Sequence, residues 1–354
     1  MSSPDFIAGR ELRTHGARIA GVVSCVPSKQ VDNDSFAERF DPSAVRDVVK
    51  MIGVDRRRWA DENTSAGDLC RKAGEKLLAG LGWQADSIDA LIFISQTPDY
   101  RLPGTSFVLQ AALGLPTSCL ALDINLGCSG YPQALWLGMN LIQSGAAKRV
   151  LLAVGDTISK MIGPNDRSTT LLFGDAGTMT ALEASPGDAP SHFVIGADGK
   201  GVRNLIVPSG GFKAYDAAAD ERMIDKSPEC LFMDGGEIFN FTLNAVPKLI
   251  ARTLEIAGSD KYAYDAFLFH QANLFMLKHL AKKAGLPADR VPTNIGEYGN
   301  TSCASIPLLM TTELKDRLKK ETLQLGMFGF GVGYSWASAA LAVGPLDIVD
   351  TIET

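Results

Sequence analysis

The sequence predicts an α/β protein built from two duplicated halves, and three observations support this fold class. The chain has 354 residues, which exceeds the usual size of one compact core. Short apolar runs typical of buried strands alternate with stretches of helical apolar spacing. A turn-rich segment, ASPGDAP at residues 184–190, interrupts this pattern near the middle. We therefore predict an N-terminal half at residues 1–185 and a C-terminal half at residues 186–354.

The N-terminal half opens with an apolar run that predicts a strand, which Pro27 ends. Helical spacing begins after Ser65, and Ser65 with Asp68 supplies the capping signal of a helix N-terminus. A later helix, ending near residue 144, is apolar nearly all round, which predicts a place inside the core. The expected elements are a strand at 17–26, a helix at 65–81, a strand at 90–95, a helix at 104–114, a strand ending near 125, the apolar helix ending near 144 and a strand at 150–155.

The C-terminal half is expected to repeat the first half in the order of its elements, although the two halves share no visible sequence identity. Residues 209–227 are polar with little periodicity, which predicts a mobile surface loop. The expected elements are a helix at 237–257, a strand at 266–269, a helix from 273, a helix at 301–318, and strands at 323–330 and 335–343 that form a closing hairpin.

Composition and charge argue against several classes of partner. The net charge is −6, and the densest basic cluster is only Arg56, Arg57 and Arg58, which is typical of a solvated surface. We find no apolar core of signal-peptide length at the amino terminus and no run of about 18 apolar residues. We therefore expect neither a nucleic-acid nor a membrane partner. The six cysteines form no CxxC pair and the four histidines do not cluster, so we expect no metal, no cofactor and free thiols in a cytoplasmic protein.

Cys128 is the strongest candidate for a nucleophile. It lies in a Gly-Cys-Ser-Gly turn between a predicted strand and the apolar helix. A helix N-terminus favours a thiolate and should lower the pKa of this thiol. Gly127 and Gly130 allow a tight turn and the close approach of a substrate. The local sequence is equally compatible with a buried structural cysteine.

Two further polar residues stand at element boundaries. His270 ends the predicted strand in FLFHQAN, and Asn300 lies in the turn of EYGNTSCASIP. Alone, each is explained as a structural histidine or as a turn or cap asparagine. With Cys128, they provide a nucleophile and two hydrogen-bond donors. The glycine-rich GFGVGYSW at residues 329–336 offers backbone N–H groups for an oxyanion hole, or is a simple hairpin turn.

Five stretches of the chain resemble, in order, the ketoacyl-acyl-carrier-protein synthase III family of the thiolase superfamily. They are DINLGCSGYPQAL, PNDRSTTLLFGDAG, HQANLFML, YGNTSCASIP and GFGVGYSWASAAL. The resemblance runs from about Ile19 to Val343 and implies a five-layered αβαβα fold and a homodimer. It implies that Cys128 takes an acyl group from a coenzyme A or acyl-carrier-protein thioester. Malonyl-acyl-carrier protein then loses carbon dioxide, and the resulting carbanion attacks the acyl-cysteine.

The resemblance also implies roles for residues around Cys128. His270 and Asn300 match the family's histidine and asparagine, whose neutral donors would stabilise the enolate that decarboxylation forms. The N–H groups of Cys128 and Val332 would make the oxyanion hole, with Val332 in place of a family glycine. Further implied substrate-binding residues are Leu102, Arg167, Phe239, Gly331 and Gly333.

The coenzyme A cradle and the acyl gate depart from the family pattern. Asp47 and Met51 stand where the family has a tryptophan and an arginine that hold coenzyme A. Lys50, Arg56 or Arg57 would then have to contact the phosphates. Leu102 matches a position where the family often has a phenylalanine that reaches into the acyl pocket of the partner subunit. This smaller gate would admit a longer or branched acyl chain.

The predicted docking helix and a second cysteine depart from the family as well. Phe275 replaces an arginine implicated in carrier-protein docking. Lys278, Lys282 and Lys283 on the same helix could attract the acidic carrier instead, or could be its solvated face. Cys303 matches a family alanine, and we interpret it as structural.

The main hypothesis is therefore a 3-oxoacyl-[acyl-carrier-protein] synthase III-like acyltransferase of fatty acid biosynthesis. Two alternatives stay open: a thiolase-fold acyltransferase that moves the acyl group to another acceptor, and a condensing enzyme of specialised metabolism of polyketide or alkyl-quinolone type. The GFGVG stretch, which also resembles the C-terminal loop of plant-type polyketide synthases, keeps the latter open. A non-catalytic partner of a condensing complex would not need the intact Cys128.

Overall fold

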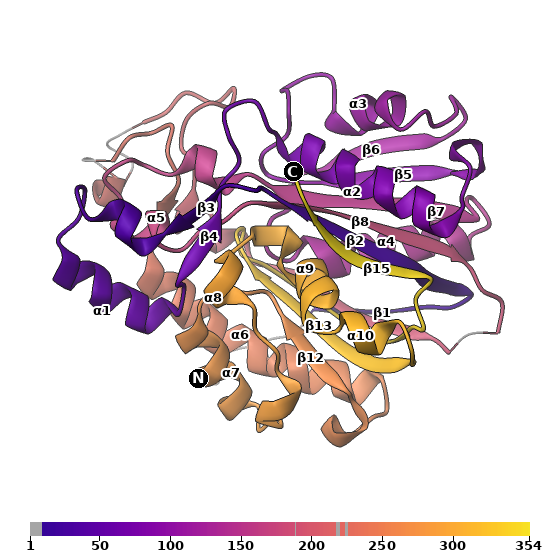
Figure 1. Cartoon of the computed structure of the whole chain (residues 1–354). Coiled ribbons are helices and arrows are strands. Elements are labelled where there is room, and N and C mark those ends of the chain that lie inside the picture. The colour runs from indigo at the N-terminus through magenta and orange to yellow at the C-terminus, as the bar shows by residue number, and fades with distance from the viewer. Residues whose placement is uncertain (1–8, 188, 217–219, 224–225) are drawn as a thin grey trace.

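Two mixed β-sheets form the frame of the molecule (Figure 1). The computed structural model describes residues 9–187, 189–216, 220–223 and 226–354. Within these ranges the first sheet has the strand order β15-β2-β8-β7-β5-β6 and the second the order β1-β9-β14-β13-β12. The strands of the first sheet are β2 (Ala17–Val26), β5 (Ala90–Ile94), β6 (Leu120–Ile124), β7 (Arg149–Asp156), β8 (Ala176–Ala184) and β15 (Ile348–Glu353). Those of the second are β1 (Arg10–Thr14), β9 (Ser191–Ala197), β12 (Ala266–Phe269), β13 (Leu323–Gly331) and β14 (Ser335–Val343).

The two sheets repeat one topology, as the order of elements in the sequence predicts. The run β2-β8-β7-β5 in the first sheet corresponds to β9-β14-β13-β12 in the second. In each run the first two pairs of neighbouring strands are antiparallel and the third pair is parallel. Each sheet also takes one strand from the other end of the chain, because β1 pairs with β9 and β15 pairs with β2. A division of the chain at residue 185 therefore does not separate the two sheets.

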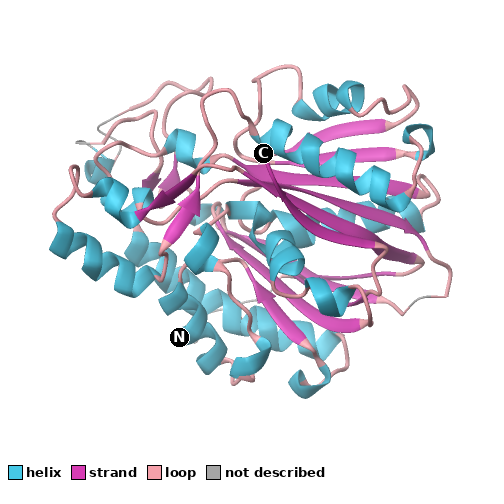
Figure 2. Cartoon of the chain, viewed as in Figure 1, coloured by secondary structure: helices cyan, strands magenta, loops and turns pink. Residues whose placement is uncertain are grey.

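Helices alternate with the sheets to give five layers (Figure 2). The helices α2 (Ala66–Leu81) and α3 (Thr105–Ala112) cover the outer face of the first sheet, and α6 (Gly235–Ile256) and α7 (Leu274–Lys283) that of the second. Between the sheets lie α4 (Gly130–Gln143) and α9 (Ser305–Thr312); α4 packs on both β7 and β14, and α9 on both β2 and β12. Their side chains join both sheets in one buried cluster, which explains why α4 is apolar nearly all round.

Shorter elements complete the described part of the chain. No helix within the described ranges is both long enough and apolar enough to cross a bilayer. The remaining α-helices are α1 (Pro42–Ile52), α5 (Arg167–Thr170), α8 (Ile295–Tyr298) and α10 (Lys315–Leu318), and the short strands are β3 (Gln30–Asp32), β4 (Arg56–Arg58), β10 (Leu205–Ile206) and β11 (Phe232–Met233). The 3-10 turns are η1 (Asn33–Phe36), η2 (Ala85–Ser87), η3 (Ile158–Met161), η4 (Gly199–Gly201), η6 (Glu221–Met223), η7 (Lys261–Ala263), η8 (Ala288–Arg290) and η9 (Ser302–Ala304).

Most of the predicted elements are confirmed within one or two residues, including the closing hairpin of β13 and β14. The capping box at Ser65 is also confirmed, because Ser65 and Asp68 bond each other's backbone N–H. The single helix expected at residues 301–318 is wrong. The structure has η9, α9 and α10 instead: Ser302, with φ of 50°, is not helical, and Leu314 separates α9 from α10 with non-helical backbone angles. The predicted loop at residues 209–227 lies partly outside the described residues; Ser209, Gly210 and Gly211 line the cavity described below.

Candidate active site

Cys128 lies buried between the end of β6 and the start of α4, as predicted. The end of β13 passes so close that only glycine fits beside it. A Cβ added at Gly331 would lie 2.9 Å from the Cys128 sulfur, and one at Gly329 would lie 2.6 Å from the Cys128 carbonyl oxygen. The backbone N–H groups of Val332 and of Cys128 itself hydrogen-bond the thiol. The turn after β13 therefore directs the Val332 N–H at the sulfur, beside the N–H of Cys128 itself.

The expected lowering of the Cys128 pKa is wrong. Burial raises the pKa of the thiol to about 12, and the charge of the buried Asp156 adds to this effect. Hydrogen bonds from Ser302, Val332 and the N–H of Cys128 act in the opposite direction without compensating. The thiol is therefore neutral at rest, and nucleophilic attack requires a base to remove its proton.

His270 follows β12 and is the base available in this site. Burial lowers its pKa to about 4, so the ring is neutral near pH 7. Its Nδ1 lies 3.2 Å from the Ser302 carbonyl oxygen and 2.9 Å from the Ser305 hydroxyl, and that hydroxyl donates to the same carbonyl at 2.8 Å. A carbonyl oxygen only accepts, so this arrangement assigns the ring proton to Nδ1. Nε2 then carries the lone pair that accepts a proton.

Asn300 is held at both its backbone and its side chain. Its N–H donates to the Leu172 carbonyl and its carbonyl accepts from the Gly174 N–H, which ties it to the N-terminal half. Its Oδ1 accepts from the Ser302 N–H at 3.0 Å, and its Nδ2 lies 3.4 Å from the Ala272 carbonyl. Because Oδ1 is bound to an N–H, the amide nitrogen is the group that can donate to a ligand.

One cavity of about 700 Å³ brings these residues together. Cys128, His270 and Asn300 line it, as do Gly331, Val332 and Gly333 of the turn after β13. Its walls are largely apolar, as is usual for small-molecule sites. The apolar lining includes Met161, Leu205, Leu231, Met233, Ile238 and Met276. In the described part of the chain, no cluster of histidine, cysteine and acidic side chains is suited to hold a metal ion.

Three predicted substrate residues lie outside this cavity lining. Arg167 is exposed at the start of α5, and Leu102 is 78% exposed. Phe239 stacks on Phe275 with ring centroids 5.8 Å apart, rather than facing Cys128. These three residues therefore do not line the cavity around Cys128 within one subunit.

One of the side chains expected to contact coenzyme A phosphates also departs from expectation. The idea that Arg57 contacts a phosphate is wrong, because Arg57 is fully buried and its guanidinium donates to the Val31 and Leu171 carbonyls. Arg56 pairs with Glu297 at 3.4 Å. Lys50 and Met51 are exposed on α1.

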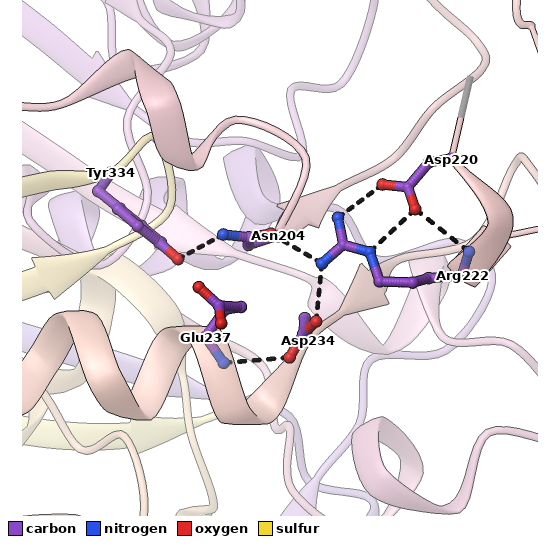
Figure 3. A network of polar contacts seen from close by, with 6 residues as sticks. All are labelled: Asn204, Asp220, Arg222, Asp234, Glu237 and Tyr334. Atoms are coloured by element: carbon purple, nitrogen blue, oxygen red, sulfur yellow. Dashed lines mark hydrogen bonds and ion pairs between the residues drawn. The ribbon is translucent and has the colours of Figure 1, made fainter.

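A polar network connects the segment around Asn204 and the start of α6, which border the cavity, to the turn after β13 (Figure 3). Asn204 donates to the Tyr334 hydroxyl at 2.6 Å and accepts from Arg222 at 3.0 Å. Arg222 also donates to Asp220 and to Asp234, the N-cap of α6. Tyr334 directly follows the glycine turn and stacks on Phe241 with centroids 4.0 Å apart. The network therefore restrains the segment that positions the Val332 N–H.

Sequence reasoning assigned no role to two polar residues of the site. Asp156, fully buried at the end of β7, accepts hydrogen bonds from Ser95, Gln96 and Thr97, and the Cys303 thiol lies 3.2 Å from its Oδ2. Ser302 bonds Cys128, His270 and Asn300. Its place two residues after Asn300 was the one available signal, and a serine in a turn carries no distinct chemistry in a sequence.

Comparisons with known proteins agree with this geometry. Residues 122–199 match the family described as 3-oxoacyl-[acyl-carrier-protein (ACP)] synthase III, and residues 254–343 match its C-terminal part. A beta-ketoacyl-[acyl-carrier-protein] synthase III from Neisseria meningitidis serogroup A is 32% identical over 325 residues. That alignment covers 92% of this chain and 98% of the relative.

Two solved structures share the fold. The 3-oxoacyl-(acyl-carrier protein) synthase from Burkholderia xenovorans LB400 is 89% identical with a TM-score of 0.97, over 98% of this chain and 99% of that chain. The 3-oxoacyl-(acyl carrier protein) synthase III from Pseudomonas aeruginosa PAO1 is 30% identical with a TM-score of 0.82, over 92% and 98%. The predicted thiolase-like fold is thereby confirmed. On the match to both family regions and on these relatives, the chain belongs to the 3-oxoacyl-[acyl-carrier-protein] synthase III family.

Proposed function

We propose that this condensing enzyme carries an acyl group as a thioester on Cys128 and joins it to a malonyl extender with loss of carbon dioxide. The observation that supports this most strongly is the cavity in which a buried thiol, a neutral histidine and an oriented amide meet. The acyl donor would be a coenzyme A or acyl-carrier-protein thioester, and the extender malonyl-acyl-carrier protein. The comparisons favour this reaction over acyl transfer to an unrelated acceptor.

In the loading step Cys128 attacks the donor thioester. His270 Nε2 accepts the thiol proton, since its Nδ1–H is bound to the Ser302 carbonyl. The oxygen that becomes negative is stabilised by the N–H groups of Cys128 and Val332, which already point at the sulfur. Collapse of the intermediate expels the donor thiol, which takes the proton back from His270. The ring is then neutral again.

In the condensing step the malonyl carboxylate leaves as carbon dioxide and negative charge moves to the thioester oxygen. The Asn300 amide N–H can donate to that oxygen. His270 can donate as well if the proton moves to Nε2. The Ser305 hydroxyl makes this possible, because it lies within hydrogen-bond distance of both Nδ1 and the Ser302 carbonyl and can donate to either. The carbanion then attacks the acyl carbon, the bond from that carbon to the Cys128 sulfur breaks, and the released thiolate takes up a proton from solvent.

A labelling experiment tests the role of Cys128. Mixing the protein with a panel of acyl-coenzyme A and acyl-carrier thioesters should add one acyl mass to the intact protein, measured by mass spectrometry. Cys128→Ala should abolish the gain, because it removes the acceptor sulfur. Cys303→Ala, which alters the neighbouring buried thiol, should retain it.

The same experiment separates the competing functions. Adding malonyl-acyl-carrier protein to the loaded enzyme should discharge the acyl group with stoichiometric release of carbon dioxide. Discharge to another acceptor without carbon dioxide would support the acyltransferase alternative, and absence of any acyl mass on Cys128 would sink the proposal.

A pH prediction follows from burial of His270. The ordinary histidine pKa is about 6.5 and the folded value is about 4, so the unfolded chain binds the proton first as pH falls. Protonation of this residue in the unfolded chain therefore lowers the free energy of unfolding as the pH falls from about 6.5 to about 4. In urea unfolding at pH 7.5 and 5, wild type should lose more free energy of unfolding than His270→Gln. The exposed His15→Gln should follow wild type, and equal losses in all three proteins would contradict the neutral assignment.

We further propose that carrier proteins dock on α7. Phe275, Lys278 and Lys282 are exposed at helical spacing, and Phe275 forms an aromatic cluster with Phe239 and His279. Lys283 instead donates to a backbone carbonyl of α6 at 2.7 Å. The cavity is lined by Ile238 and Met276, the sequence neighbours of Phe239 and Phe275, so this surface adjoins it. Its positive charge complements an acidic carrier.

The double variant Lys278→Glu/Lys282→Glu tests this docking surface. It should raise the KM for malonyl-acyl-carrier protein by about tenfold, since it replaces two attractive charges with two repulsive ones. The rate of Cys128 loading from an acyl-coenzyme A should stay unchanged. Lys319→Glu/Lys320→Glu makes the same charge change at another exposed site and should leave this KM unaltered. Equal effects of the two double variants would contradict the assignment.

We also propose that the chain forms a homodimer through the edge of the first sheet. The strand β6 is an edge strand, and it exposes Leu120 while Phe107 on α3 and Leu102 are also exposed. An unpaired edge with apolar neighbours is suited to pair with a second copy. Leu102, outside the cavity of its own subunit, would then be free to reach that of its partner.

Light scattering tests the dimer. Wild type should have twice the mass of one chain, and Leu120→Lys should shift the equilibrium toward the monomer because it buries a charge at the proposed interface. A monomeric wild type at micromolar concentration would exclude the proposal.

Finally, we place the enzyme in the cytoplasm, since its six cysteines are free thiols. Recovery of the chain outside the cytoplasmic fraction would refute this.

A further inference from the structure

Ser302 contacts Cys128, His270 and Asn300, each through a different polar group. It is buried, with 2% of its surface exposed, and lines the cavity. Its N–H donates to Asn300 Oδ1 at 3.0 Å, and its carbonyl lies 3.2 Å from His270 Nδ1. Its hydroxyl hydrogen-bonds the Cys128 thiol. One residue thus contacts the nucleophile, the base and the amide donor.

The backbone of Ser302 adopts a conformation that a side chain disfavours. Its φ is 50°, and among the described residues it is the non-glycine residue with a positive φ. Such a conformation persists only where its surroundings hold it. Here the neighbouring Asn300 is fixed by backbone hydrogen bonds to Leu172 and Gly174. The conformation lets the N–H and the carbonyl of a single residue serve two different side chains.

A structural turn would account for part of this arrangement. It would explain the positive φ and the capping of Asn300, but it would not need a hydroxyl on the Cys128 sulfur. That contact matters chemically, because the sulfur becomes negative when His270 removes its proton. An O–H donor stabilises the thiolate more than the neutral thiol, as hydrogen bonds to charged groups are stronger.

We propose that Ser302 is a positioning residue for the condensation described above. Its carbonyl holds the Nδ1–H tautomer of His270, its N–H orients the Asn300 amide, and its hydroxyl stabilises the Cys128 thiolate as the thiol proton passes to His270 Nε2. The serine keeps its own proton throughout. The inference rests on the proposed function, but its main test requires no acyl substrate.

Ser302→Ala and Ser302→Gly test the hydroxyl. Both remove it, and glycine also accepts the positive φ without strain. The rate of Cys128 alkylation by iodoacetamide, followed from pH 7 to 10 by intact mass, should fall about tenfold at each pH in both variants, because less thiolate is present. Decarboxylation of malonyl-acyl-carrier protein without a donor should stay within about threefold of wild type, since the backbone bonds to His270 and Asn300 remain.

Ser302→Thr tests the backbone in the opposite sense. It keeps the hydroxyl, but a β-branched residue strongly disfavours a positive φ. Alkylation of Cys128 should stay near the wild-type rate, whereas decarboxylation should fall at least about tenfold. Thr301→Ala is the matched control, since it removes a hydroxyl from the same turn that bonds none of Cys128, His270 or Asn300, and should resemble wild type in both assays.

The outcomes distinguish this inference from the proposed function. Wild-type alkylation profiles in folded Ser302→Ala and Ser302→Gly would overturn the role of the hydroxyl. If alkylation slows as expected while no thioester ever acylates Cys128, Ser302 still tunes the thiol and the proposed reaction fails instead. Threonine behaving like wild type in decarboxylation would overturn the backbone role.

Discussion

The contact between β13 and Cys128 is the constraint on which the rest of the site depends. The nucleophile belongs to the N-terminal half of the chain, and the strand that approaches it belongs to the C-terminal half. The backbone of Gly329 and Gly331 comes so near that a methyl group at either position would collide with Cys128. Only this approach allows the Val332 N–H to reach the sulfur. This one contact therefore packs the two halves of the chain together and also positions the Val332 N–H beside the nucleophile.

Burial sets the protonation states of the site. Desolvation penalises charge, so it raises the pKa of the Cys128 thiol and lowers that of His270. Both groups rest in their neutral forms. A neutral thiol and a neutral ring need no buried counter-charge before the acyl donor binds. The cost is that the thiolate exists only when His270 accepts a proton, and hydrogen bonds from the Ser302 hydroxyl and two backbone N–H groups then stabilise it.

The sequence allowed much of this site to be predicted because its residues follow the ends of helices and strands. Cys128 follows β6, His270 follows β12 and Asn300 follows α8; each stands in a recognisable motif, and the structure brings them into one cavity. The direction of the Cys128 pKa could not be predicted, since the helix N-terminus is local whereas desolvation depends on atoms from both halves. The role of Ser302 could not be predicted from the sequence either. Its function lies in the direction of its backbone groups, which no residue type encodes.

The outer elements of the fold were harder to predict than its core. The strand β1 is short and largely exposed, so its sequence has no apolar alternation, and β15 follows the glycine-proline turn after the closing hairpin. Their pairing is decided by residues that are far away in the sequence. The non-helical backbone at Ser302 was missed because helical spacing continues through it, while the backbone bonds of Asn300 and Ser302 impose another conformation.

The exchange of β1 and β15 also determines when the molecule can become complete during synthesis. The strand β15 follows every other described strand in the chain, yet it pairs with β2, which is made before most of the other strands. Until then, one side of β2 has no strand partner, although the nucleophile and most of its sheet have already been made. Such a long-range closure is slow, and an open apolar edge invites association with other chains. The first sheet is therefore incomplete, with an edge open to association, until β15 has been made and has paired with β2.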